Sequence, residues 1–226
     1  MFDGKFRQSV DAHTAPIGHT LVRWGFSADV LTGSGLVFAL VTAWLIGTGH
    51  HHWAILTLTL TGFHDLFDGP VAKASQKSSV RGSFFDSVVD RVSDGVLLGG
   101  VAYFLVAQHR GQLVLLPFAI LVTTFMISYQ RSKAESLGLH AKGGLMERAE
   151  RMILLGVSFV SPVVFIPVLW ALLVLTAATA TGRFVRVWIA ATQPKEAKEK
   201  VAWPDRVRRH SQHTGRRRGF SRSLRQ

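Results

Sequence analysis

The chain has 226 residues, of which 48% are hydrophobic and 18% are charged, and its formal net charge is +12. The mean hydropathy is positive, which argues against a soluble nucleic-acid-binding protein and against disorder over most of the chain. The absence of cysteine excludes disulfides, zinc-thiolate sites, iron–sulfur clusters and cysteine nucleophiles. The composition therefore predicts an all-α integral membrane protein.

The N-terminal segment, residues 1–28, is predicted to be an interfacial helix. Phe2, Phe6 and Val10 recur at helical spacing among basic residues, a pattern typical of a helix that lies in the membrane interface. Pro16 is a candidate bend in this helix. The same pattern also fits an ordinary amphipathic helix packed on the rest of the protein.

Six membrane-spanning helices are expected between residues 29 and 193, because a span needs about 20 apolar residues. The last apolar block has 40 residues and contains Pro162 and Pro167, which suits a tight hairpin of two spans broken at these prolines. The apolar stretches are 30–47, 53–63, 82–107, 113–129 and 152–191.

The basic residues alternate between the two sides of this arrangement. The segments before the first span, between the second and third, and between the fourth and fifth are all basic, whereas Arg110 is the one Lys or Arg in the opposite turns. By the positive-inside rule, both termini are expected on the cytoplasmic side of the plasma (inner) membrane. The tail, residues 194–226, carries 11 basic and 3 acidic residues. We expect it to be disordered and held near anionic headgroups. A nucleic-acid-binding arm is disfavoured because the tail lacks a regular pattern of aromatic residues interleaved with its basic ones.

Five carboxylates lie in or beside the second and third spans. Asp65 and Asp68 are three residues apart, Asp86 and Asp90 are four apart, and Asp94 continues the second series, so each series shares one face of its helix. A carboxylate in hydrocarbon costs roughly 2.5–3.5 kcal/mol on insertion scales. Four carboxylates at one depth would repel one another, and two hard divalent cations would neutralise them.

The same carboxylates also fit two arrangements that need no resident metal. They could form interhelical salt bridges with Lys73, Lys77, Arg81 and Arg91. They could also line a proton or cation pathway, although the later spans have no acidic residue in their apolar stretches.

The carboxylates belong to a longer pattern that resembles the signature of the CDP-alcohol phosphotransferases. The pattern reads Asp65-x-x-Asp68-Gly69-x-x-Ala72-Lys73, eight residues, then Gly82-x-x-x-Asp86-x-x-x-Asp90. Lys73 is the one departure, because the family usually has arginine there. Lysine keeps the charge but lacks the bidentate guanidinium fork.

This resemblance implies a six-span, homodimeric membrane transferase whose site residues can be carried onto the matching positions. The implied metal ligands, for two Mg²⁺ or Mn²⁺ ions, are Asp65, Asp68, Asp86 and Asp90. Asp90 would also be the catalytic base for the acceptor hydroxyl. The implied CDP-binding residues are Asp29, Thr32, Gly69, Ala72, Lys73 and Gly82.

The second half of the chain is similar to the actinobacterial phosphatidylinositol phosphate synthases, in segments 128–135 and 144–151. That similarity implies transfer of a phosphatidyl group from CDP-diacylglycerol to inositol 1-phosphate, with release of CMP. The residues expected at the acceptor phosphate are Arg131, Lys133, Arg151 and Arg183. These cations could instead snorkel to headgroups, and Glu147 could pair with Arg151 at i, i+4.

Alternative acceptors are glycerol 3-phosphate, which also carries a phosphate, and phosphatidylglycerol. Two membrane helices that carry acidic residues are also compatible with proteins of other classes. These are a divalent-cation transporter and a nonenzymatic membrane scaffold. No nucleic-acid partner is expected. The expected partners are CDP-diacylglycerol, a polar acceptor, membrane lipid and a second copy of the chain.

Overall fold

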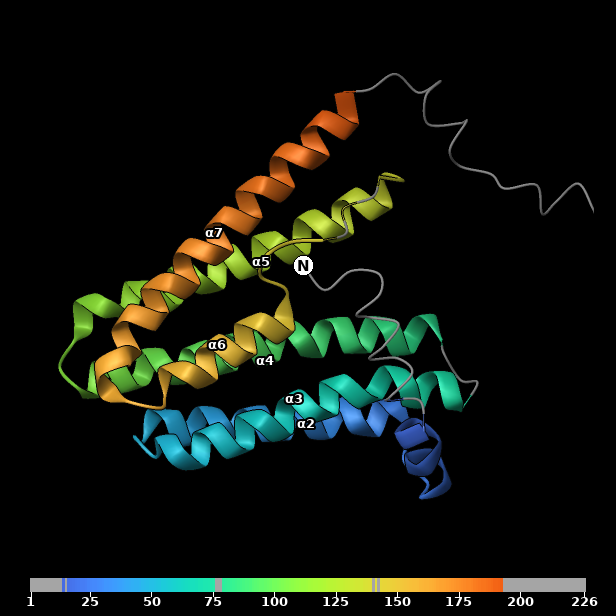
Figure 1. The fold of residues 1–226 in the computed structure, drawn as a ribbon, viewed down its shortest axis with the longest axis horizontal. Coiled ribbons are helices and arrows are strands. Elements are labelled where there is room, and N and C mark those ends of the chain that lie inside the picture. The colour runs from blue at the N-terminus through green and yellow to red at the C-terminus, as the bar shows by residue number, and fades with distance from the viewer. Residues whose placement is uncertain (1–13, 15, 76–78, 140, 142, 193–226) are drawn as a thin grey trace, which may run out of the picture. The chain divides into compact units, whose positions relative to one another are not determined.

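The computed structural model describes residues 14, 16–75, 79–139, 141 and 143–192, and all regular structure in these ranges is helical (Figure 1). Residues 16–23 are helical, but Phe2, Phe6, Val10 and the predicted 194–226 tail lie outside the described ranges. The chain divides into two compact units, Met1–Val187 and Trp188–Gln226. The elements are α2 (Ala28–Gly47), α3 (His51–Ala74), α4 (Val80–Ala107), the 3₁₀ helix η1 (Gly111–Val114), α5 (Leu115–Ser136), α6 (Arg148–Ser158) and α7 (Pro162–Thr192).

Side-chain caps and a proline fix where three of the helices begin. The Ser27 hydroxyl accepts a hydrogen bond from the backbone N–H of Val30 at the start of α2. The Ser79 hydroxyl accepts one from Gly82 N at 3.0 Å at the start of α4. Each cap satisfies a donor that the first helical turn leaves unpaired. Pro162 begins α7, where its missing N–H costs nothing.

Helix α2 packs against both α3 and α4. It lies close to α3 where the hydroxyls of Thr42 and Thr57 are 2.8 Å apart. Helix α2 also lies close to α4, because a Cβ atom added to Gly100 would lie 2.5 Å from the carbonyl oxygen of Ala43. A glycine at this position lets two backbones meet, as small residues do in membrane helix pairs.

The remaining helices pack against α3, α4 and one another. Helix α4 contacts α5, and α3 contacts α6. The hydroxyls of Thr123 in α5 and Thr176 in α7 lie 2.9 Å apart. A shared apolar core includes Leu58, Leu97 and Leu169 from three different helices. This packing brings the ends of α3, α4 and α6 together, which positions the site described below.

Three helical segments are long and apolar enough to cross a membrane: Ala28–Gly47, Gly111–Ser136 and Pro162–Thr192. The last apolar block forms two helices, α6 and α7, with the turn at residues 159–161. Helix α7 is one of the three candidate spans, whereas α6, with 11 residues, is not. The expectation that Pro167 also breaks this block is wrong, since Pro167 lies inside α7. A proline can remain in a membrane helix when neighbouring groups satisfy the freed carbonyl.

Candidate functional site

The carboxylates of α3 and α4 converge, as their spacing predicts. Asp65, Asp68 and Asp86 each offer an oxygen, and these three oxygens lie within 4.8 Å of one another. The three residues are half-buried. Asp90 lines the same small cavity, together with Thr32, His64, Ser93 and Arg148. The two helix faces therefore do meet at one place.

The chemistry of this donor set fits a hard divalent cation. Three carboxylates in close proximity provide oxygen ligands and negative charge, the combination that Mg²⁺ and Mn²⁺ prefer. The absence of cysteine from the chain removes the thiolate ligands that would favour zinc. Within the described part of the chain, Asp65, Asp68 and Asp86 form the acidic group close enough to share one ion.

Asp90 differs from the other three carboxylates because two arginines contact it. Its Oδ1 is in contact with Nη1 of Arg148, and its Oδ2 lies 3.6 Å from Nη1 of Arg91. Arg148 also places its Nε 3.5 Å from Oδ2 of Asp65. Interhelical salt bridges are thus present in part, although their main cation is Arg148, which was not predicted for this site.

Arg148 comes from the first turn of α6, far along the chain from α3 and α4. Its side chain is only 14% exposed, and a buried guanidinium needs anionic partners. The available sequence signal was its place three residues before Arg151, in the segment 144–151 that was assigned to the acceptor. Residues i and i+3 lie near one another on a helix. If Arg151 faces the acceptor site, Arg148 therefore lies close enough to reach the neighbouring carboxylates.

The positions expected at the nucleotide lie beside the carboxylates. The Thr32 hydroxyl lies 3.3 Å from Asp68 Oδ2 and 3.0 Å from the backbone carbonyl of Ala28, and it can donate its one hydrogen to either acceptor. A Cβ atom on Gly82 would lie 3.5 Å from Asp29 Oδ1, so the first turns of α2 and α4 meet there. Asp29 also forms an exposed ion pair with Arg81, at 3.8 Å.

The remaining nucleotide positions follow Asp68 along α3. Gly69 has no atom within 4 Å of where a Cβ would be, which leaves open space beside the helix. Ala72 is half-buried, and Lys73 lies in the last turn of α3. These residues line the α3 surface between the carboxylates and the end of the helix.

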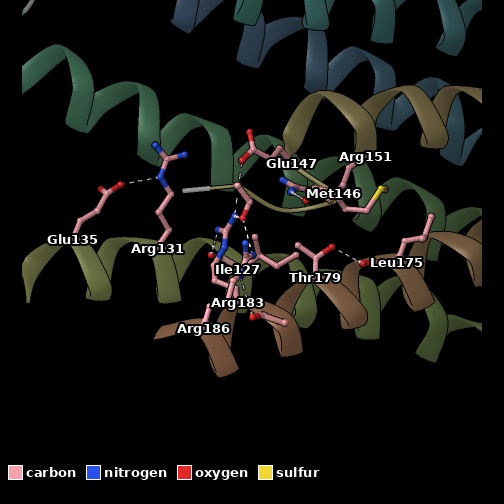
Figure 2. A network of polar contacts seen from close by, with 12 residues as sticks. Ile127, Arg131, Glu135, Met146, Glu147, Arg151, Leu175, Thr179, Arg183 and Arg186 are labelled. Atoms are coloured by element: carbon pink, nitrogen blue, oxygen red, sulfur yellow. Dashed lines mark hydrogen bonds and ion pairs between the residues drawn. The ribbon is translucent and has the colours of Figure 1, made fainter. Parts of the chain in front are cut away.

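The arginines expected at the acceptor phosphate gather around the loop that precedes α6, as Figure 2 shows for Arg131, Arg151 and Arg183. Arg151 donates from Nη2 to Asp94 Oδ2 at 2.8 Å. Arg183 donates from Nη1 to the Ile127 carbonyl at 2.8 Å. Both arginines are buried, which disfavours the alternative that they snorkel to headgroups.

The other two basic positions are more open. Arg131 pairs with Glu135 at 3.1 Å, and both side chains are nearly half exposed. Lys133 is exposed in the last turn of α5. The alternative pairing of Glu147 with Arg151 is replaced, because Arg151 binds Asp94 and Glu147 lies 4.0 Å from Arg183. The cluster therefore combines two buried arginines, fixed by protein groups, with two exposed cations.

A family model described as CDP-alcohol phosphatidyltransferase matches residues 26–188. The chain belongs to this family. As a CDP-alcohol phosphatidyltransferase it is a transferase, and the signature at residues 65–90 carries the carboxylates that converge in the structure.

Individual members of the CDP-alcohol phosphatidyltransferase family are also similar to this chain. The phosphatidylinositol phosphate synthase of Mycobacteroides abscessus is 33% identical over 150 residues, which cover 66% of this chain and 68% of the relative. The Mycobacterium tuberculosis phosphatidylinositol phosphate synthase with CDP-DAG bound has a TM-score of 0.70 and 29% identity, covering 77% of this chain and 93% of the other. The same enzyme in complex with manganese and citrate has a TM-score of 0.70 and 30% identity, covering 77% and 88%.

Proposed function

We propose that this protein transfers a phosphatidyl group from CDP-diacylglycerol to inositol 1-phosphate and releases CMP. The observation that carries the proposal is the convergence of the family's carboxylates around one cavity, beside a cluster of cations. The relatives named phosphatidylinositol phosphate synthase, and the related structure with CDP-DAG bound, support this choice of donor and acceptor.

The four carboxylates Asp65, Asp68, Asp86 and Asp90 would hold two divalent cations. The related structure with manganese supports this kind of ion. When bound, these cations would neutralise the pyrophosphate of the donor and stabilise the charge on the departing CMP.

In this mechanism Asp90 would accept the proton of the acceptor hydroxyl. That oxygen would form a bond to the phosphorus carrying the diacylglycerol, and the bond from this phosphorus to the bridging oxygen would break, so that CMP leaves with the electron pair. Asp90 would then return the proton to water. A positioned carboxylate base typically contributes about 10²–10⁴-fold to the rate.

The residues around the carboxylates would bind and orient the two substrates. Asp29, Thr32, Gly69, Ala72, Lys73 and Gly82 would bind the CDP group. Arg131, Lys133, Arg151 and Arg183 would bind the acceptor phosphate. Arg151 and Arg183 are held in place by their own hydrogen bonds, and a donor group held in place near a phosphate needs no reorganisation when the phosphate binds.

The membrane arrangement belongs to the same proposal. A six-helix domain, residues 29–193, would follow an interfacial helix at 1–28 and precede a basic tail at 194–226, with both termini on the cytoplasmic side of the plasma membrane and two copies forming a dimer. Helices α3 and α4 have 24 and 28 residues, enough to span about 30 Å. Helix α6 has 11 residues and would extend only part of the way.

The test is an assay of CMP release by the purified protein with CDP-diacylglycerol and each candidate acceptor. Inositol 1-phosphate is expected to support the highest kcat/KM. Faster turnover with glycerol 3-phosphate or phosphatidylglycerol would keep the reaction class and change the acceptor. Metal uptake into vesicles that depends on Asp86 and Asp90, without CMP formation, would favour a transporter instead.

A further inference from the structure

The four signature carboxylates are not equivalent in their cationic contacts. Asp65, Asp68 and Asp86 bring one oxygen each within 4.8 Å of one another, and Asp90 stands outside this set. Both oxygens of Asp90 face guanidinium groups, those of Arg148 and Arg91. The negative charge of Asp90 is therefore already balanced by protein groups.

Arg148 is the more important of these two arginines. Its side chain is 14% exposed, compared with 35% for Arg91, so its charge is less screened by solvent. It also contacts Asp65 from α3, and it thereby links α3 to Asp90 of α4. A unit positive charge between these two carboxylates repels any divalent cation that approaches Asp90.

The guanidinium of Arg148 contacts signature carboxylates from two helices, Asp65 of α3 and Asp90 of α4. The two buried arginines nearby bind other groups: Arg151 donates to Asp94 at 2.8 Å, and Arg183 donates to a backbone carbonyl at the same distance. Of these three arginines, Arg148 is therefore the one that competes with a divalent cation for the signature carboxylates.

We infer that Arg148 makes the two cation positions unequal. The first divalent cation binds tightly to Asp65, Asp68 and Asp86, whose combined charge exceeds that of one ion. The second cation must share Asp90 with Arg148, so it binds weakly and only as the guanidinium moves aside. Arg148 is thus a positioning residue that sets the order of metal loading. This inference rests on the proposed two-metal function.

The test measures Mn²⁺ binding directly, by titrating the purified protein in detergent and following free Mn²⁺ by electron paramagnetic resonance. In the wild type, one ion is expected to bind about tenfold or more tightly than the second. Arg148→Gln is expected to tighten the second ion by several-fold and narrow the gap, while Arg148→Lys, which keeps the charge, preserves it. Arg110→Gln, which removes an exposed arginine beyond the other end of α4, serves as the matched control and should leave both affinities unchanged.

Two results would overturn the inference: two ions of equal affinity in the wild type, or an unchanged second affinity in folded Arg148→Gln. If Arg148→Gln does not fold, Asp90→Asn provides the second test, because it should weaken the loose ion and leave the tight one in place. Loss of the tight ion in Asp90→Asn would contradict the inference.

The same preparation separates this inference from the proposed function. A wild type that releases CMP from CDP-diacylglycerol but binds two equal ions would disprove the role of Arg148 alone. A folded wild type that neither binds Mn²⁺ nor releases CMP would disprove the proposed function.

Discussion

Arg151 and Asp94 form an ion pair in which Nη2 of the arginine donates to Oδ2 of the carboxylate at 2.8 Å, and both side chains are only 8% exposed. The two residues lie on α6 and α4, so the pair joins these helices beside the carboxylate cavity. Breaking a buried pair by removing one partner leaves an uncompensated charge, which typically costs about 3–5 kcal/mol.

Arg151→Ala is therefore expected to lower the thermal unfolding temperature of the purified protein. The double variant Arg151→Leu with Asp94→Leu should recover much of this loss, because no buried charge is left over. Unfolding of all variants is followed by circular dichroism in the same detergent. Equal stability of Arg151→Ala and the wild type would show that the pair contributes nothing to the fold.

A second prediction for Arg151 concerns the KM for the acceptor, which distinguishes a role in acceptor binding from a role in folding. Arg151→Lys keeps the charge opposite Asp94 but loses the guanidinium fork. It is expected to raise the KM for inositol 1-phosphate while the KM for CDP-diacylglycerol changes little. An unchanged acceptor KM in a folded Arg151→Lys or Arg151→Ala protein would remove Arg151 from the acceptor site.

The adjacent glycines Gly99 and Gly100 of α4 allow a matched test of the packing between α2 and α4. A Cβ atom at Gly100 would meet the Ala43 backbone at 2.5–3.0 Å, whereas one at Gly99 has no neighbour within 4 Å. Gly100→Ala should therefore force α2 and α4 apart and destabilise the protein. Gly99→Ala should be neutral or slightly stabilising, since alanine has the higher helix propensity. Equal unfolding temperatures for the two variants would contradict this account of the α2–α4 contact.

Removal of divalent cations should stop the reaction. EDTA is expected to abolish CMP release, and added Mg²⁺ or Mn²⁺ should restore it, because the carboxylates alone would repel the donor pyrophosphate. Full activity in EDTA-treated protein would exclude the two-metal mechanism.

Asp90→Asn should lower kcat by about 10²–10⁴-fold, the usual contribution of a general base. Glu150→Gln in α6 is the charge-matched control.

For Thr32 we predict a smaller loss of kcat/KM, which depends on its hydroxyl group. Its hydroxyl lies 3.3 Å from Asp68 Oδ2, and one hydrogen bond of this kind contributes roughly 0.5–1.5 kcal/mol. Thr32→Val, which keeps the shape of the side chain, should lower kcat/KM for CDP-diacylglycerol by about 2–10-fold. Thr32→Ser, which keeps the hydroxyl, should stay close to the wild type. A larger loss in Thr32→Ser than in Thr32→Val would contradict a role for the hydroxyl.

The sequence predicted the helical class, the six helices α2 to α7 and the meeting of the α3 and α4 carboxylates. Helical spacing was sufficient for this, because residues three and four apart share a face whatever the helix packs against. The helices α3 and α5 extend beyond the apolar stretches by which they were predicted, since hydropathy marks the apolar part of a helix and not its polar turns.

Tertiary structure alone decided which cations meet which carboxylates. Arg148 reaches Asp65 and Asp90, and Arg151 reaches Asp94, from a helix more than 50 residues further along the chain. The spacing of residues reports the face of one helix, but it carries no information on the register between helices. That register depends on close contacts such as the one at Gly100 and on the packing of α6 against α3, which side-chain volumes set only when the helices have assembled.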